Sequence, residues 1–334
     1  MKKRTAFIGA ILSLIPLGQP LLIKTGVVLS SSALIFSLPD KVHAGDNSYY
    51  FDRAYDKAQR GDHYGAIADY TKAIEIDPKD ALAYYNRGIS KGKSEDYYGA
   101  IADYTKAIEI DPNAAKAYFN RALNKGKLKD HYGAIADYTK AIEIDPNDAD
   151  AYYNRGNLKR KLNDNYGAIA DYTKAIEINP NYENAYLNRG ISKGKSEDYY
   201  GAISDFITLI EINPNYADAY YNRGVTKEKL EDYNGAISDY TKVIEINPNY
   251  ENAYYGRGNS KSSLKDHYGA ISDYTKVIEI NPNYENAYLN RGRSYYSLND
   301  EGSACKDFKK AVFLGHTSTE EWLNSEGGSW CRNM

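Results

Sequence analysis

One 34-residue stretch decides the fold of this chain: residues 81–114 read ALAYYNRGISKGKSEDYYGAIADYTKAIEIDPNA. The stretch recurs through most of the 334 residues, and its proline returns at every 34th position as Pro78, Pro112, Pro146, Pro180, Pro214, Pro248 and Pro282. A fixed period of this length indicates a repeat architecture rather than several independent domains. The sequence predicts eight units, which span 47–80, 81–114, 115–148, 149–182, 183–216, 217–250, 251–284 and 285–318.

Each unit contains two helical patterns separated by an aspartate. Tyr84 and Gly88 stand four residues apart, as do Ala100 and Tyr104, so each pair lies on one face of a helix. Asp96 precedes the second pattern, where its carboxylate can accept from the free N–H groups that open a helix. The proline ends that helix because it has no amide hydrogen. Each unit is therefore predicted to be a helical hairpin, and the hairpins must stack because two short helices cannot bury an apolar stripe alone.

The repeated positions resemble the tetratricopeptide repeat family over residues 47–318. The residues that carry the resemblance in one unit are Tyr84, Gly88, Tyr97, Ala100, Tyr104, Ala107 and Pro112. The resemblance implies an all-α fold, a right-handed superhelical solenoid of eight antiparallel helix-turn-helix repeats, with the first helices lining a concave surface. Arg87 and Lys91 depart from the family pattern, which usually has an aliphatic and an aromatic residue at these two positions.

An arginine and an aspartate recur at fixed positions in every unit. The arginines are Arg53, Arg87, Arg121, Arg155, Arg189, Arg223, Arg257 and Arg291, and the aspartates are Asp69, Asp103, Asp137, Asp171, Asp205, Asp239, Asp273 and Asp307. A partly buried guanidinium needs a carboxylate partner, because an unpaired buried charge is costly. We therefore predict an Arg–Asp bridge within or between hairpins. The alternative hypothesis is that the arginines form a row that binds a ligand.

The resemblance implies that candidate binding residues lie on the exposed face of the first helices, in three rows. The first row has side-chain amides that can donate to and accept from a peptide backbone, the second is aromatic, and the third is positively charged. The rows are Asn86, Asn120, Asn154, Asn188, Asn222 and Asn290; Phe51, Tyr85, Phe119, Tyr153, Tyr221 and Tyr255; and Lys93, Lys127, Lys161, Lys195 and Lys229. Alternatively, the asparagines are inherited from the template and the lysines form a solvated face. Some relatives clamp a C-terminal carboxylate with lysine and asparagine, but the lysine is largely missing here, so no clamp is predicted.

The sequence contains no recognisable catalytic or metal-binding motif. It has no Gly-rich phosphate loop, no zinc-ligand spacing and no Gly-x-Ser-x-Gly turn. The carboxylates recur identically in each unit, whereas a catalytic site requires one converging geometry. We therefore predict a protein that is not an enzyme and uses no cofactor or metal. The net charge of -3 and the lack of a basic run also argue against binding to nucleic acid.

Residues 1–44 differ in composition from the rest of the chain. A basic start is followed by two apolar stretches and by Val42, His43 and Ala44, a pattern typical of a secretory signal cleaved after Ala44. The alternative is a retained N-terminal membrane anchor, which would be the chain's contact with the membrane and would leave the repeats facing outward. We expect an exported protein, in the periplasm or outside the cell.

The C-terminal segment 319–334 lies outside the repeats and is predicted to cap the exposed face of the last hairpin with Trp322 and Leu323. Both cysteines of the chain, Cys305 and Cys331, lie near this end. An oxidising compartment would permit a disulfide between them. The alternative is that Cys305 is a small core residue, since it occupies a position held by isoleucine in other units.

These features lead to one functional hypothesis and two alternatives. The leading hypothesis is a non-catalytic scaffold or adaptor that binds a protein or peptide partner in the groove of a solenoid. One alternative is a structural protein that self-associates by end-to-end stacking of repeats. The other is an accessory subunit of an envelope enzyme, with catalysis supplied by another chain.

Overall fold

The computed structural model describes residues 46–332 and residue 334, so the predicted signal or anchor at 1–44 lies outside the described residues. Among the described residues the regular structure is helical, with no strand. None of the described helices is both long enough and apolar enough to span a membrane.

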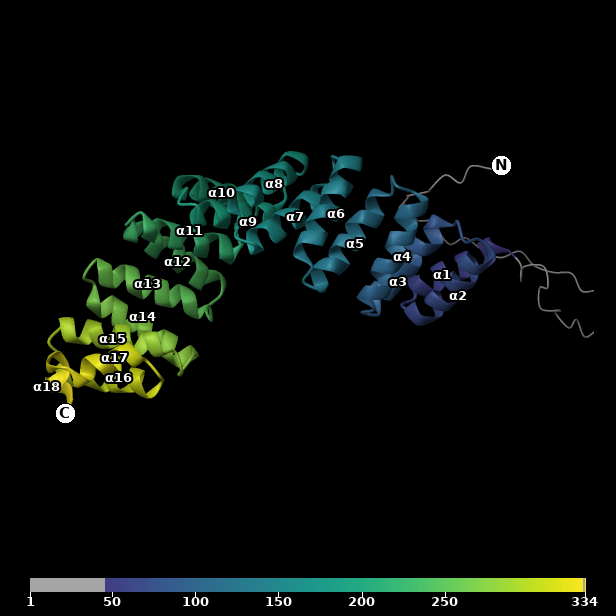
Figure 1. The fold of residues 1–334 in the computed structure, drawn as a ribbon. Coiled ribbons are helices and arrows are strands. Elements are labelled where there is room, and N and C mark those ends of the chain that lie inside the picture. The colour runs from purple at the N-terminus through teal and green to yellow at the C-terminus, as the bar shows by residue number, and fades with distance from the viewer. Residues whose placement is uncertain (1–45, 333) are drawn as a thin grey trace, which may run out of the picture. The chain divides into compact units, whose positions relative to one another are not determined.

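Eight helical hairpins follow one another through residues 47–313 (Figure 1). Their first helices are α1 (Asn47–Gln59), α3 (Ala81–Lys93), α5 (Ala115–Lys127), α7 (Ala149–Lys161), α9 (Glu183–Lys195), α11 (Ala217–Lys229), α13 (Glu251–Ser263) and α15 (Glu285–Ser297). Their second helices are α2 (His63–Ile76), α4 (Tyr97–Ile110), α6 (His131–Ile144), α8 (Asn165–Ile178), α10 (Tyr199–Ile212), α12 (Tyr233–Ile246), α14 (His267–Ile280) and α16 (Glu301–Phe313). The chain ends with α17 (Thr317–Asn324), η1 (Glu326–Gly328) and α18 (Ser329–Arg332).

The hairpins pack in chain order. Each second helix contacts its own first helix and the first helix of the next hairpin. Most first helices also contact the first helix of the next hairpin, for example α9 with α11, and this contact is sparsest between α5 and α7. The face on which the first helices meet is called the first-helix face below. The predicted all-α stack of helix-turn-helix repeats is thus confirmed.

An aspartate caps every second helix, as predicted. Asp96 Oδ1 accepts a hydrogen bond from the amide of Gly99 at 2.9 Å, and the seven equivalent aspartates make the same contact in their own units. The bond satisfies one of the free N–H groups that open the helix. A buried ring lies against each first helix: a β-carbon added to Gly88 would stand 2.8 Å from Cε1 of Tyr104. Glycine at this position therefore permits the close approach of the two helices of a hairpin.

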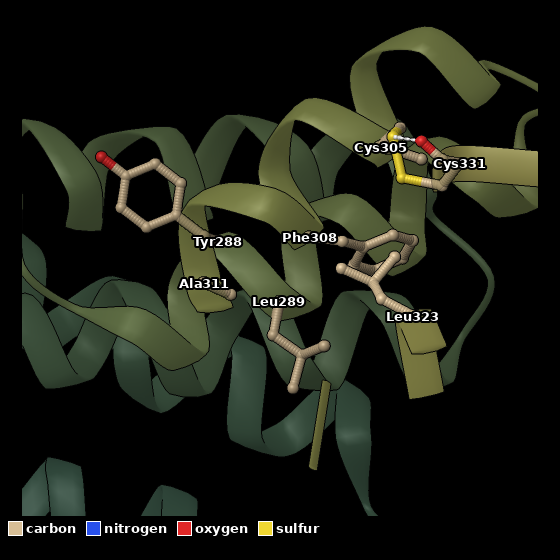
Figure 2. Close-up of a cluster of buried hydrophobic side chains, with 8 residues drawn as sticks. Tyr288, Leu289, Cys305, Phe308, Ala311, Leu323 and Cys331 are labelled. Carbon is tan, nitrogen blue, oxygen red and sulfur yellow. Dashed lines mark hydrogen bonds between the residues drawn. A yellow bond between two sulfur atoms is a disulfide. The ribbon is translucent and has the colours of Figure 1, made fainter. Parts of the chain in front are cut away.

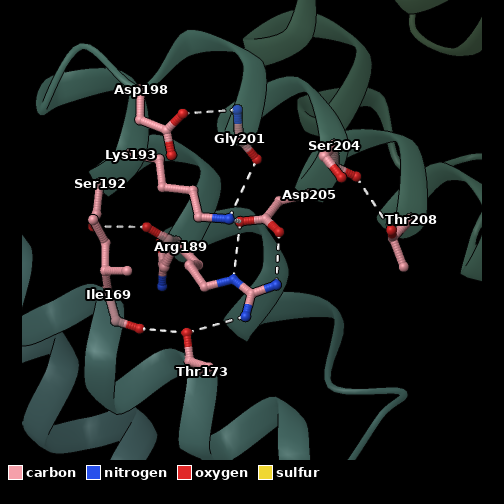
Figure 3. Close-up of polar contacts among 11 residues, drawn as sticks. Ile169, Thr173, Arg189, Ser192, Lys193, Asp198, Gly201, Ser204, Asp205 and Thr208 are labelled. Carbon is pink, nitrogen blue, oxygen red and sulfur yellow. Dashed lines mark hydrogen bonds and ion pairs between the residues drawn. The ribbon is translucent and has the colours of Figure 1, made fainter.

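The predicted Arg–Asp bridge is confirmed, and it includes a third group. Figure 3 shows the fifth unit, where Arg189 donates through Nε and Nη2 to the carboxylate of Asp205 at 2.9 and 2.7 Å. Lys193 Nζ reaches the same carboxylate at 2.9 Å. Asp205 is only 3% exposed, so its charge is stabilised almost wholly by these two cations. The two departures from the family pattern, arginine and lysine, are therefore a matched set around one aspartate.

The same arginine also links neighbouring hairpins. Arg189 Nη1 donates to Thr173 Oγ1 of the preceding hairpin at 3.1 Å, and Thr173 in turn donates to the carbonyl of Ile169. Its guanidinium also lies over the ring of Tyr186, 5.5 Å from the centroid. Because the arginines are used in this way in unit after unit, the geometry favours a structural role over the alternative of a ligand-binding row.

The C-terminal segment packs on the last hairpin, as predicted. Figure 2 shows Leu323 beside Phe308, and Trp322 meets the Phe308 ring edge-on with the centroids 5.1 Å apart. The cap begins earlier than the unit boundary at 318, because α17 starts at Thr317. The last unit has His316 where the other units have proline, and the His316 side chain accepts from the amide of Thr319 at the start of this helix.

The buried ionic set leads to a prediction about stability. We expect Asp205→Ala to lower the free energy of unfolding by about 3 kcal/mol, because it leaves two cations in poorly solvated positions without an anion. Their side chains are 14% and 19% exposed. Denaturation in urea measures the change. The control is Glu177→Ala, which removes an exposed ion pair with Lys174 and should leave the midpoint nearly unchanged. Equal midpoints for the two variants would contradict a structural role for the aspartate.

Candidate functional site

The three predicted rows of binding residues lie on the first-helix face and differ in solvent exposure and in their contacts. The asparagines are half-buried, and the aromatic row is largely half-buried. The lysines of the charged row, Lys93, Lys127, Lys161, Lys195 and Lys229, are all exposed and have no ion-pair partner among the described residues. The lysines two positions earlier in each first helix, such as Lys193, are instead held by the buried aspartates. The lysine repeat therefore has one structural row and one row with free charge.

Half of the asparagine row is bonded across hairpins. Asn120 Nδ2 donates to the hydroxyl of Tyr85 in the preceding hairpin at 2.9 Å, and Asn188 Nδ2 donates in the same way to Tyr153 at 3.1 Å. Asn290 repeats this contact with the preceding tyrosine hydroxyl. These three amides are thus used to join neighbouring first helices.

The other half of the row turns back on its own helix. Asn86, Asn154 and Asn222 donate to the backbone carbonyl four residues earlier at 2.8, 2.8 and 2.7 Å. The physical reason lies in the preceding hairpin, where the residue facing each of them is Phe51, Phe119 or Leu187 and has no hydroxyl. These three asparagines keep a side-chain carbonyl with no partner among the described residues, so it is available to accept from a ligand.

A pocket on the first-helix face brings three of the predicted residues together. It lies between α9 and α11 and has a volume of about 320 Å³. Asn222, Lys195 and Lys229 line it. Its apolar part comes chiefly from Ile191, Phe206 and Val225, which are not among the binding residues predicted from the sequence. An apolar floor with an amide and two free cations at its edge suits a ligand with one apolar group and nearby negative charge.

The other predicted residues are not part of this pocket. Tyr85 lines a separate depression of about 360 Å³ between α3 and α5, with Leu82 and Lys116. Tyr153 and Tyr221 instead pack against the rings of Tyr182 and Tyr250. Phe119 contacts the buried ring of its own hairpin. The predicted rows are therefore distributed along the stack rather than gathered at one place.

The floor of the pocket between α9 and α11 is apolar because the fifth unit has phenylalanine where six units have tyrosine. In the fourth and seventh units the buried ring of the second helix is tyrosine, and its hydroxyl donates to an asparagine of the first helix: Tyr172 to Asn157 and Tyr274 to Asn259, both at 2.8 Å. Phe206 has no hydroxyl, and Ile191 stands where those asparagines stand. Two apolar side chains thus stand where those two units have a polar contact.

The charge of the face comes from the lysines and not from the tyrosines. Burial raises the pKa of Tyr221 and of Tyr85, so both phenols stay protonated at neutral pH. Burial also raises the pKa of Tyr172 to about 12. Within the part of the chain that the structure describes, no cluster of three or more His, Cys, Asp or Glu side chains could hold a metal ion.

Comparison with known proteins identifies the repeat. Models of the tetratricopeptide repeat match residues 81–114, 149–182, 217–250 and 251–284, and a further model of this repeat matches 285–312. A model described as TPR repeat matches residues 55–94 and 126–163. No match to a curated protein was found.

Solved structures agree with this assignment. YrrB, described as a TPR protein with an unusual peptide-binding site, is 30% identical, and the match covers 55% of this chain and 95% of YrrB with a TM-score of 0.52. The C-terminal part of a TPR repeat-containing protein from Cytophaga hutchinsonii is 20% identical and covers 72% of this chain and 99% of its own, with a TM-score of 0.62. The second comparison shows the fold alone.

The chain is a member of the tetratricopeptide repeat family. Proteins of this family bind protein or peptide partners and are typically non-catalytic repeat scaffolds.

The two states of the asparagine row can be distinguished experimentally. Asn188→Ala removes two bonds to the preceding hairpin, with Tyr153 and Asn157, and we expect it to destabilise the fold by about 1 kcal/mol. Asn222→Ala removes only a bond within its own helix, so its effect should be less than half as large. Urea midpoints of the two single variants measure the difference. A larger loss for Asn222→Ala would rule out this division of the row.

Proposed function

We propose that this protein is a non-catalytic scaffold that binds a partner polypeptide along its first-helix face, with the pocket between α9 and α11 as the main anchor. The observation that carries the proposal is the composition of this pocket. Ile191, Phe206 and Val225 provide apolar surface, and the two unpaired lysines lie beside it. A single buried anchor side chain surrounded by weaker polar contacts is the usual energetic pattern of a protein interface.

The pocket also defines the chemistry of the partner. The segment it would take has one large apolar side chain for the floor and at least one acidic residue nearby for Lys195 and Lys229. The free side-chain carbonyl of Asn222 can accept from a backbone N–H of that segment. Sequence choice would come mainly from the apolar residue and the charge. The description of YrrB as a protein with a peptide-binding site supports a polypeptide as the ligand.

The test is a binding titration with peptides that carry one leucine or phenylalanine flanked by aspartate or glutamate. We expect Phe206→Tyr to weaken binding about tenfold, because the new hydroxyl would put a polar group into the apolar floor beside Ile191. This variant should fold normally, since six other units have tyrosine at that position. The double variant Lys195→Gln/Lys229→Gln should also weaken binding about tenfold and reduce its dependence on salt.

The matched control is Lys174→Gln, which removes an exposed lysine of a second helix and should leave affinity unchanged. Binding that is equal for the wild type, Phe206→Tyr and the double lysine variant would exclude this pocket as the anchor. A preference for peptides without acidic residues would exclude the proposed role of the two lysines.

We further propose that the protein is exported and that Cys305 and Cys331 form a disulfide. The basic and apolar composition of residues 1–44 supports export. The Cα atoms of the two cysteines are 5.3 Å apart, within the range of a disulfide, and both side chains are buried. An exact mass of the mature protein would report both features: a chain that starts at Gly45 and is two hydrogens lighter than its reduced form. A full-length reduced mass would contradict both.

A further inference from the structure

A second pocket lies on the first-helix face of the last hairpin. It has a volume of about 460 Å³ and is lined by residues of α15, α16 and the cap helix α17. This volume falls within the range of sites for small molecules. The cap helix covers it with Trp322, and Tyr296 stands at its side. The cap helix, which does not follow the 34-residue template, thus completes a pocket whose other lining residues come from the last repeat unit.

The floor of this pocket repeats the exception found in the fifth unit. Phe308 replaces the buried tyrosine, and Leu289 replaces the aromatic residue of the first helix, as Phe206 and Leu187 do in the fifth unit. Neither side chain has a hydroxyl, so the floor is apolar. At the position where the fifth unit has Ile191, the last unit has Arg293.

Arg293 is the charged residue of the pocket lining, and no carboxylate lines the pocket. Its guanidinium has no ion-pair partner among the described residues and makes one long hydrogen bond, to Asn290 Oδ1 at 3.3 Å. The hydroxyl-bearing residues Ser297, Ser318 and Thr319 also line the pocket. A guanidinium presents several donors in a fork that fits a carboxylate.

From this combination we infer that the pocket binds a small apolar carboxylic acid: its carboxylate lies against Arg293 and its apolar body lies among Leu289, Phe308 and Trp322. A single cation beside an apolar and aromatic floor selects one negative charge attached to an apolar group. The site is separate from the pocket between α9 and α11, so the chain would carry a small-molecule site in addition to its polypeptide groove. The same chemistry occurs at the C-terminal residue of a polypeptide, which the experiment below separates from a free acid.

The test uses the intrinsic fluorescence of the wild-type protein. The chain has two tryptophans, and both lie here: Trp322 lines the pocket, and Trp330 stacks on Tyr296 with the ring centroids 5.4 Å apart. Phenylpropionate is titrated against the protein, with phenylpropionamide as the neutral counterpart and acetate as the acid without an apolar body. We expect a saturable change with phenylpropionate alone, confirmed by calorimetry.

Two variants locate the binding. Arg293→Gln should weaken the binding of phenylpropionate about tenfold, since it removes a charge-assisted pair whose arginine is exposed to solvent. Phe308→Tyr restores the residue that six units have, keeps the fold and should weaken binding by filling the floor. Lys195→Gln/Lys229→Gln is the control and should bind phenylpropionate as the wild type does. A failure of the proposed acid-binding pocket can therefore be distinguished from a failure of the proposed polypeptide groove.

Three results would overturn the inference. One is equal binding of the acid and the amide, and another is unchanged affinity in Arg293→Gln. The third is binding only of a peptide that ends in phenylalanine with a free carboxylate, and not of phenylpropionate, which would assign the pocket to a chain end.

Discussion

The stack depends on one buried aspartate in each second helix. In the fifth unit this is Asp205, which accepts from an arginine and a lysine of its own first helix while that arginine donates to the preceding hairpin. A carboxylate this poorly solvated is stable only while its cations stay in place. The same group therefore fixes the pairing of helices within a hairpin and contributes to the pairing between hairpins. The link between hairpins is interrupted at Arg223, because Ile207 replaces the threonine of the preceding unit.

Because the aspartate, arginine and lysine hold the hairpins together, residues on the first-helix face can vary without loss of the fold. The contacts on this face then depend on which residues carry a hydroxyl group. A tyrosine hydroxyl is bonded wherever a neighbouring first helix offers an amide, as between Asn188 and Tyr153. Where phenylalanine or leucine stands at the tyrosine position instead, the asparagine donates to a backbone carbonyl of its own helix. The tyrosine hydroxyl of the preceding hairpin thus decides whether an asparagine of this row joins two hairpins or keeps its side-chain carbonyl free for a ligand.

The sequence was sufficient for the parts of the structure that one unit specifies by itself. The helical spacings, the aspartate caps and the Arg–Asp pairing follow from a single 34-residue template. The ends of the first helices were not predictable in this way, because Glu95 and its equivalents adopt a left-handed conformation, with φ near 64°, at a position where only the first unit has glycine. Closure of the helix end by the amide of Asp96, which donates to the carbonyl of Lys91, stabilises this conformation.

The site was less predictable, because it depends on contacts between units and not on any one of them. Reading the asparagines as one row gave them equal roles, whereas the role of each is set by the residue 35 positions earlier, as for Asn120 and Tyr85. The signal was present in the sequence as departures from the template. A repeat position with the same residue in every unit cannot select a partner at one place. In this chain the positions that are identical in every unit stabilise the fold. The paired change to leucine and phenylalanine occurs in the fifth and the last unit, and both of these units carry a pocket on the first-helix face. In a repeat protein of this uniformity, specificity is therefore expected at the units that depart from the template.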